Sequence, residues 1–205
     1  MPRYVNHETR RRELVEAAMV VLGEQGLKGF ALKSVAARLG GSVTMVTHYY
    51  DSRQALLDDL AKSMLAWWEE DLERIKAEAT TPAERLRRVL EWLLPLEDQD
   101  RVVERGRVHL LADTNEPLNT RHLFEAWDRK MRAFIRAPVR ELVPEARVEA
   151  TVELLRTITN GIVLSSIEQP EKWPAERMLR VLDDALALMG LGDQLALTDG
   201  RSSTS

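Results

Sequence analysis

Apolar residues recur every three or four positions along most of the chain. Between residues 8 and 25 they follow the spacing i, i+3, i+4, i+7, i+8 at Leu14, Ala17, Ala18, Val21 and Leu22. That spacing places the side chains on one face of an α-helix. Gly26 and Gly29 follow, and glycine commonly ends a helix because it adopts positive φ at no steric cost. The pattern predicts an amphipathic first helix of about five turns.

Two short helices are predicted next. The first has Val35, Ala36 and Leu39 on one face, and the second has Val43, Val46 and Tyr50 on its inner side. Residues 40–41 are both glycine, which predicts a tight turn between the two helices. A pair of short helices joined by a glycine-containing turn is the pattern of a helix-turn-helix.

Longer helices are predicted in the rest of the chain. Ser52 can cap a helix that keeps its period to about Ala79, and residues 81–84, Thr-Pro-Ala-Glu, form a capping box for the next. Further helices are predicted over residues 101–113, 118–136, 145–168 and 174–189, with Pro138 and Pro144 as breaks. No segment alternates apolar and polar residues as a strand does. The predicted fold class is therefore all-α, with about nine helices.

The charge of the chain is unevenly distributed. Residues 1–53 carry eight Lys and Arg against five Asp and Glu, a net charge of +3, whereas the whole chain of 205 residues carries −4 and the remainder therefore −7. This distribution is expected where only the first segment approaches DNA phosphates, although chance clustering would give the same counts. We predict a DNA-binding helix-turn-helix domain at 1–53, a second helical domain at 54–192 and a flexible tail at 193–205.

The composition argues against several classes of protein. Without cysteine the chain has no disulfide, thiolate nucleophile or cysteine metal ligand. The four histidines, His7, His48, His109 and His122, have no metal-binding spacing, and no Gly-x-Ser-x-Gly motif occurs, so we expect no enzyme activity, metal or cofactor. No apolar run reaches the ~18 residues that span a bilayer, and the N-terminus lacks a secretory signal. We expect a cytoplasmic protein with no membrane partner.

Polar residues gather on the third predicted helix. Its outer side carries Ser42, Thr44, Thr47 and His48, while Val46 and Tyr50 supply its apolar back. In a major groove, hydroxyl groups can bond bases or phosphates and a threonine methyl can contact a thymine methyl. Arg53, at the start of the next helix, is placed to hold a phosphate. The alternative is a packed helical turn whose polar residues are only solvated.

Four motifs follow one another within residues 10–57. They are Val35-Ala36-Ala37-Arg38-Leu39-Gly40, Ser42, Thr47-His48-Tyr49-Tyr50 and Ser52-Arg53. The segment resembles the N-terminal DNA-binding domain of TetR-family transcriptional regulators, whose signature has Ile/Val-Ala-x-x-Ala/Leu-Gly, a recognition helix that closes in Tyr/Ser-His-Tyr-Phe, and Ser-Lys. Spacing, residue type and N-terminal position agree over nearly fifty residues.

The resemblance implies a homodimer that binds a palindromic operator in double-stranded DNA, as a repressor that a small-molecule inducer releases. On the family pattern, Lys33, Thr44, Met45 and Thr47 face bases, whereas His48, Tyr49 and Arg53 hold phosphates. Three positions depart from the pattern. Gly41 replaces an apolar residue and is expected to loosen the recognition helix, Ala31 leaves the second helix without a hydroxyl cap, and Thr47 replaces a tyrosine.

The C-terminal part resembles the BetI-type subgroup, repressors of choline and betaine pathways. The similarity covers residues 154–190 and the small residue before His48. Two apolar helices are predicted there, and with their symmetry mates they would form a four-helix bundle. The predicted dimer interface consists of Gly161, Ile162, Ser165, Ser166, Leu182 and Leu186. The alternative is that these side chains pack within one chain.

A ligand site is expected among the middle helices. A small-molecule site needs a mostly apolar cavity with a few polar groups. The residues that fit are Trp67, Trp68, Trp92, His109, Trp127 and Asn160. Aromatic residues at helical spacing more often belong to a plain core. The alternative function is a helical small-molecule carrier protein with a vestigial DNA-binding head.

Overall fold

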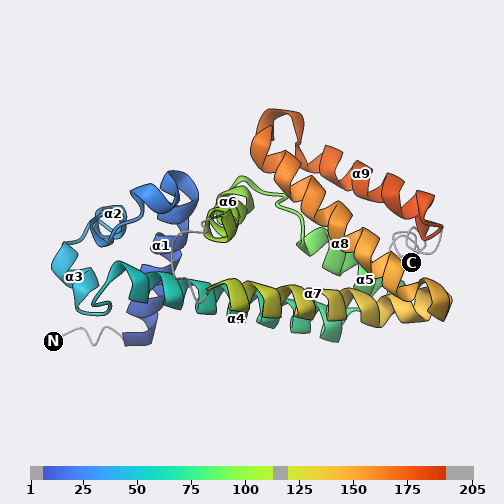
Figure 1. The fold of residues 1–205 in the computed structure, drawn as a ribbon, viewed down its shortest axis with the longest axis horizontal. Helices are drawn as coiled ribbons and strands as arrows, with labels where there is room; N and C mark the ends of the chain where they lie inside the picture. The colour runs from blue at the N-terminus through green and yellow to red at the C-terminus, as the bar shows by residue number, and fades with distance from the viewer. Residues whose placement is uncertain (1–6, 113–119, 193–205) are drawn as a thin grey trace, which may run out of the picture. The chain divides into compact units, whose positions relative to one another are not determined.

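The computed structural model describes residues 7–112 and 120–192 of this chain. Over these residues it forms nine α-helices and no strand, which confirms the all-α prediction (Figure 1). The helices are α1 (His7–Gly29), α2 (Leu32–Arg38), α3 (Val43–Thr47), α4 (Arg53–Glu78), α5 (Pro82–Trp92), α6 (Asp98–Ala112), α7 (Thr120–Leu142), α8 (Glu145–Glu168) and α9 (Ala175–Leu188), with a short 3₁₀ helix, η1 (Pro170–Lys172), before α9.

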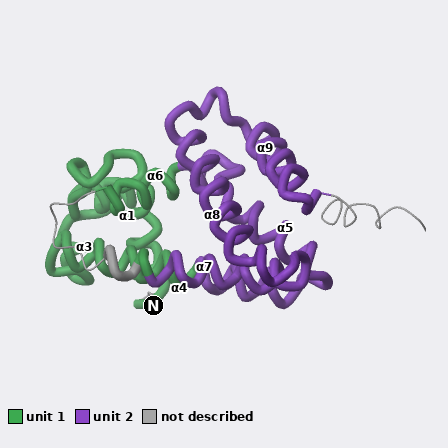
Figure 2. Tube along the Cα trace, turned by 45° about the vertical axis from the view of Figure 1, so that its right-hand side comes forward, with its two compact units in different colours: residues 1–67, 102–125 green, residues 68–101, 126–205 purple. Residues whose placement is uncertain are grey.

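Two compact units make up the chain (Figure 2). The first comprises residues 1–67 and 102–125, and the second comprises residues 68–101 and 126–205. The boundary that we predicted after residue 53 differs, because α4 starts at Arg53 and stays in the first unit as far as Trp67. The first unit therefore holds more than the helix-turn-helix. The predicted tail at 193–205 lies outside the described residues.

The first unit depends on a close approach between α1 and α6. Gly23 on α1 is buried, and a β-carbon built there would lie 2.1 Å from the carbonyl oxygen of Val102 on α6. A β-carbon at the buried Gly106 would lie 3.4 Å from the amide nitrogen of Gly23. Because neither glycine has a side chain, the two backbones can touch. The apolar core of the unit includes Leu14, Ala18, Leu22, Phe30, Val35, Val46, Leu56 and Leu60.

The second unit contains α8 packed along α9 (Figure 1). Both helices start directly after a proline, Pro144 and Pro174, as proline suits the first residues of a helix. Buried side chains include Leu86, Leu90, Met131, Ile135, Leu155, Ile162, Met178, Leu182 and Leu186. These residues form an apolar core that α5, α7, α8 and α9 share.

Two helices continue past residues that we predicted would end them. In α1 the chain kinks at Gly26, where φ is 63°, and stays helical to Gly29. The α7 helix runs through Pro138 to Leu142, although proline removes one helical hydrogen bond. The last turn still closes, because the amide of Val143 bonds to the carbonyl oxygen of Val139 at 3.0 Å.

Side-chain caps start three of the helices, of which those at Ser52 and Thr81 were predicted and that at Ser42 was not. The Oγ of Ser42 accepts a hydrogen bond from the amide of Met45 at 3.3 Å, and that of Ser52 accepts one from Ala55 at 3.0 Å. The Oγ1 of Thr81 accepts a hydrogen bond from the amide of Glu84 at 3.1 Å. The Glu84 carboxylate accepts one from the amide of Thr80, where a capping box would use the amide of Thr81. Ala31, at the start of α2, provides no side-chain cap. The caps thus fix α3 and α4, which flank the predicted DNA-facing segment.

Candidate nucleic-acid interface and ligand region

A tight turn sets α3 against α2. Gly40 has a φ of 63°, a conformation that favours glycine, and the amide of Gly41 bonds to the carbonyl oxygen of Ala36 at 2.9 Å. Val46 and Tyr50 are buried beneath α3. This arrangement leaves the opposite face of α3 exposed, as a helix-turn-helix requires.

The structure places most of the predicted DNA-contacting side chains on that outer surface. Exposed residues are Lys33, Ser42, Thr44, Thr47 and His48, while Met45, Tyr49 and Arg53 are half-buried. The Oγ1 of Thr47 donates to the carbonyl oxygen of Thr44 at 3.2 Å. The hydroxyls of Ser42 and Thr47 therefore also serve α3 itself. Their roles toward DNA remain predictions.

Met45 occupies the space that Gly41 leaves. A β-carbon at Gly41 would lie 2.7 Å from Cε and 2.8 Å from Sδ of Met45. Arg10 of α1 donates to the sulfur from the other side. Gly41 thus leaves room for the Met45 side chain to pack back against the turn, and the expected loosening of α3 stays a prediction.

Arg53 is bonded to the backbone near the end of α1. Its Nε donates to the carbonyl oxygen of Phe30 at 3.0 Å, and Nη2 donates to that of Leu27 at 2.9 Å. The guanidinium also lies 6.0 Å from the centre of the Phe30 ring. A phosphate at Arg53 would have to share a group that already ties α4 to residues 27–30.

A cleft of about 480 Å³ lies beside the segment that follows α3. It is lined by His7, Glu8, Arg11, His48, Tyr49 and Tyr50. The His7 ring centre lies 6.1 Å from that of His48 and 5.5 Å from that of Tyr49. His7 was not predicted as a site residue, because it precedes the apolar repeat that marks the first helix. The cleft brings together two residues predicted to hold phosphates.

One carboxylate ties this cleft to α4. Asp59, only 8% exposed, accepts a hydrogen bond from Tyr50 Oη at 2.5 Å and one from Arg11 Nε at 2.8 Å. Burial alone would raise the pKa of Asp59, but the hydrogen bonds from Arg11 and Tyr50 outweigh it and hold that pKa below its usual range. Burial, reinforced by the Asp59 carboxylate, raises the pKa of Tyr50. No pattern of neighbouring residues marks Asp59 itself as functional.

Three of the four predicted ligand-site tryptophans meet in the second unit. The ring centres of Trp68 and Trp127 are 5.1 Å apart, and that of Trp92 lies 6.5 Å and 6.4 Å from them. Trp92 Nε1 donates to the Asp71 carboxylate at 3.3 Å. Trp67 belongs to the first unit, where the Arg12 guanidinium lies 5.2 Å from its ring centre.

The other two predicted ligand residues are placed apart from each other in the chain's two units. His109 belongs to the first unit, where its ring would lie 3.3 Å from a β-carbon at Gly26. Asn160 belongs to the second unit and accepts a hydrogen bond from Arg156 Nη1 at 2.8 Å. Of the predicted ligand residues, the second unit thus holds Asn160 and the tryptophan cluster formed by Trp68, Trp92 and Trp127, and their role toward a ligand stays a prediction.

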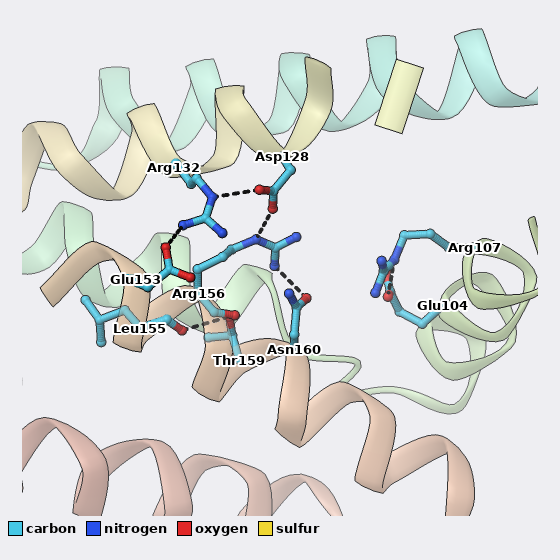
Figure 3. Close-up of polar contacts among 9 residues, drawn as sticks. All are labelled: Glu104, Arg107, Asp128, Arg132, Glu153, Leu155, Arg156, Thr159 and Asn160. Carbon is cyan, nitrogen blue, oxygen red and sulfur yellow. Dashed lines mark hydrogen bonds and ion pairs between the residues drawn. The ribbon is translucent and has the colours of Figure 1, made fainter. Parts of the chain in front are cut away.

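A ladder of ion pairs joins α7 and α8 next to Asn160 (Figure 3). The buried Arg156 donates through Nε to Asp128 at 2.9 Å, and Arg132 Nε reaches the same carboxylate at 2.6 Å. Arg132 also pairs with Glu153 of α8. Burial raises the pKa of Asp128, but the bonds from Arg132 and Arg156 outweigh it, so its pKa lies below the usual range.

The predicted dimer interface stays a prediction, but its residues differ in how far the single chain buries them. Ile162, Leu182, Leu186 and Ser166 are at most 3% exposed there. These four side chains lie on α8 and α9 and leave little of their surface for a second chain. Gly161 is exposed and Ser165 is half-buried. The exposed large apolar residues of α8 and α9 are Leu154 (51%), Leu164 (46%) and Leu188 (90%).

Within residues 7–112 and 120–192, none of the helices has the length and hydrophobicity of a membrane span. No group of three or more His, Asp or Glu side chains there is arranged to hold a metal ion.

The C-terminal half of the chain matches a known family. Residues 82–190 match the family model described as "BetI-type transcriptional repressor, C-terminal". The curated relative "HTH-type transcriptional regulator BetI" of Paraburkholderia xenovorans is 24% identical over 190 residues, which cover 92% of this chain and 97% of the relative. Its namesake from Rhizobium meliloti is 23% identical and covers 80% of this chain and 81% of its own.

Solved structures of regulators share the fold. A putative transcriptional regulator from Saccharomonospora viridis, in complex with choline, aligns with a TM-score of 0.79 at 16% identity, over 88% of this chain and 97% of its own. A TetR transcription regulator from Haloarcula marismortui aligns with a TM-score of 0.74 at 20% identity, over 91% of this chain and 98% of its own. A transcriptional regulator from Rhodococcus aligns with a TM-score of 0.75 at 20% identity, over 87% of this chain and 94% of its own.

Proposed function

Since this chain belongs to the BetI-type transcriptional repressors of the TetR family, and is thus a ligand-responsive DNA-binding regulator, we propose that it represses transcription as a homodimer on a palindromic operator. The observation that carries the proposal is the α3 helix, whose polar face is exposed while Val46 and Tyr50 are buried behind it. The proposed place of action is the cytoplasm.

Each part of the exposed face has a proposed role on DNA. Lys33, Thr44 and Thr47 face base edges, with the half-buried Met45 at the margin. His48 and Tyr49, at the end of α3, hold phosphates beside the cleft. Arg53 contributes its charge from α4 while it stays bonded to Phe30 and Leu27.

The proposed dimer contact uses the outer faces of α8 and α9. Leu154, Gly161 and Leu164 lie seven and then three residues apart on α8, and all are exposed. A β-carbon built at Gly161 meets nothing within 4 Å, so a second helix can approach the backbone there. Leu188 of α9 adds apolar surface. Two such helix pairs would form a four-helix bundle, which holds two recognition helices about one DNA turn apart.

The proposed inducer site is the second unit's tryptophan cluster, with Arg156 and Asn160 as polar groups. Aromatic faces attract quaternary ammonium groups, and the Saccharomonospora structure holds choline, so choline is the first ligand to test. The three rings lie close enough to touch one another. A trimethylammonium group would therefore bind on an outer ring face, close to the Asp71 carboxylate at Trp92.

Binding measurements with a duplex selected from a random pool test the proposal. At fixed salt, Thr47→Ala should weaken the selected duplex and spare unrelated DNA, whereas His48→Ala should weaken both, because phosphate contacts are independent of sequence. Choline should reduce the affinity for the selected duplex, and Trp92→Ala should abolish that reduction. A chain that binds choline but no DNA would be the carrier protein, and the regulator proposal would be wrong.

A further inference from the structure

We infer that Asp59 is a positioning residue for DNA binding, which acts through Tyr50 and Arg11 on the segment that carries His48 and Tyr49. The inference rests on the proposed function, in which those two residues hold phosphates. It assigns a role in DNA binding to a side chain on α4 that does not itself face the groove.

Asp59 joins three separate elements of the first unit. Its Oδ2 accepts hydrogen bonds from Tyr50 Oη at 2.5 Å and from Arg11 Nε at 2.8 Å, and its Oδ1 pairs with Arg11 Nη2. Arg11 comes from α1, Tyr50 from the segment between α3 and α4, and Asp59 from α4. Both oxygens of one buried carboxylate are thus used to hold the three together.

Packing alone does not account for a carboxylate at this place. The flanking positions of α4, Leu56 and Leu60, are completely buried, so Asp59 interrupts an apolar surface. Burying a charge is unfavourable unless it is paired and hydrogen-bonded. Directional bonds to Tyr50 and Arg11 satisfy the charge, and they fix orientation in a way that apolar contacts cannot.

The DNA-facing residues adjoin this anchor in the chain and in space. His48 and Tyr49 line the same cleft as Arg11 and Tyr50. The amides of Tyr49 and Tyr50 both bond to the carbonyl oxygen of Val46 at 3.0 Å. A shift of the Tyr50 side chain would therefore move the end of α3, where the proposed phosphate contacts lie.

The test compares Tyr50→Phe and Asp59→Asn with Glu24→Gln as the matched control. Glu24 accepts from Arg38 at 3.2 Å and also ties two helices of the first unit together, but far along α1 from the cleft. Asp59→Asn and Glu24→Gln each remove one negative charge. Charge alone therefore predicts that both variants bind DNA more tightly.

Positioning predicts the opposite sign for Asp59→Asn. Operator affinity should fall about tenfold in Asp59→Asn and in Tyr50→Phe, the size of one lost hydrogen bond to a charged group. The slope of log affinity against log salt should shrink by about one, as expected for a lost phosphate contact. Glu24→Gln should bind as well as the wild type. The double variant should be little worse than either single variant, because the two changes break one contact.

All variants are measured at a temperature where circular dichroism shows them folded. The inference would be overturned if Tyr50→Phe and Asp59→Asn kept the wild-type affinity and salt slope and lost only melting temperature. Asp59 would then be merely structural. If Asp59→Asn does not fold, Tyr50→Phe decides, because it keeps the buried ring and removes only the hydroxyl. A wild-type chain without sequence-specific binding would instead overturn the proposed function before any variant is compared.

Discussion

Gly23 of α1 and Val102 of α6 touch through their backbones, so closely that a β-carbon at residue 23 would lie 2.1 Å from the Val102 carbonyl oxygen and 2.7 Å from its Cγ1. The carbonyl oxygen belongs to the backbone and cannot rotate away. Any side chain at residue 23 must therefore push α1 and α6 apart within the first unit.

Gly23→Ala should lower the free energy of unfolding by about 3 kcal/mol, because overpacking forces the backbones to move. Urea denaturation measures the loss. Ala133→Ser on the exposed face of α7 is the control, because it adds one atom where the side chain meets solvent. It should lower the free energy of unfolding by no more than about 0.5 kcal/mol, as surface substitutions do. Equal stability of the two variants would contradict the α1–α6 contact.

Arg156→Met should destabilise the chain by about 2 kcal/mol, because it removes the buried guanidinium that bonds to the half-buried Asp128 and Asn160. The same exchange at Arg136, whose partner Glu149 is largely exposed, should change stability little. Urea denaturation of both variants provides the comparison. If Arg156→Met matched Arg136→Met, the buried end of the ladder would not be the stabilising part.

Stability should depend on pH through Asp59 and Asp128, whose pKa values are both lowered in the folded chain. Their contribution is complete above the pKa of an unfolded aspartate, about 3.9, and is lost as the pH falls through the lower folded pKa. The free energy of unfolding should thus decline steeply below about pH 4. Asp128→Asn should have a flatter profile in urea titrations from pH 6 to pH 2.5, and an unchanged profile would speak against the lowered pKa of Asp128.

Leu154→Glu with Leu188→Glu should convert a dimer to monomers, because charges would be buried at the proposed contact of α8 and α9. Sedimentation velocity distinguishes the two states. Ala133→Glu places the same charge on the exposed face of α7 and should leave the dimer intact. Dissociation by Ala133→Glu, or a dimer that survives the double change, would place the contact elsewhere.

Much of the fold could be predicted from the sequence. The spacing of apolar residues located α8 over 145–168, and hydroxyl residues at Ser52 and Thr81 marked helix starts that the structure confirms. Proline was less informative: α7 passes Pro138, because the missing hydrogen bond falls near the end of the helix, where the next turn still closes.

The site was only partly predictable, because periodicity gives a face of a helix but not its neighbour. Apolar spacing could not tell whether Leu182 packs within the chain or against a second copy, and it packs within. Trp67 and Trp68 are adjacent in sequence yet point about 100° apart around α4, so only Trp68 joins the cluster. Asp59 could not be recognised from its own position, because its partners Arg11 and Tyr50 belong to other elements of the first unit. Tyr50 stands where the family signature has phenylalanine, and its added hydroxyl was the one available sign.

The central claim is that paired α3 helices recognise a specific DNA sequence. Its most direct test is to incubate the full-length chain with a pool of random duplexes and to sequence those that it retains. We predict an enriched palindrome whose half-sites are centred about one helical turn apart, and its loss from the retained pool when Thr44 and Thr47 are both replaced by alanine. Retention of duplexes without any enriched sequence, or the same palindrome with the double variant, would contradict the claim.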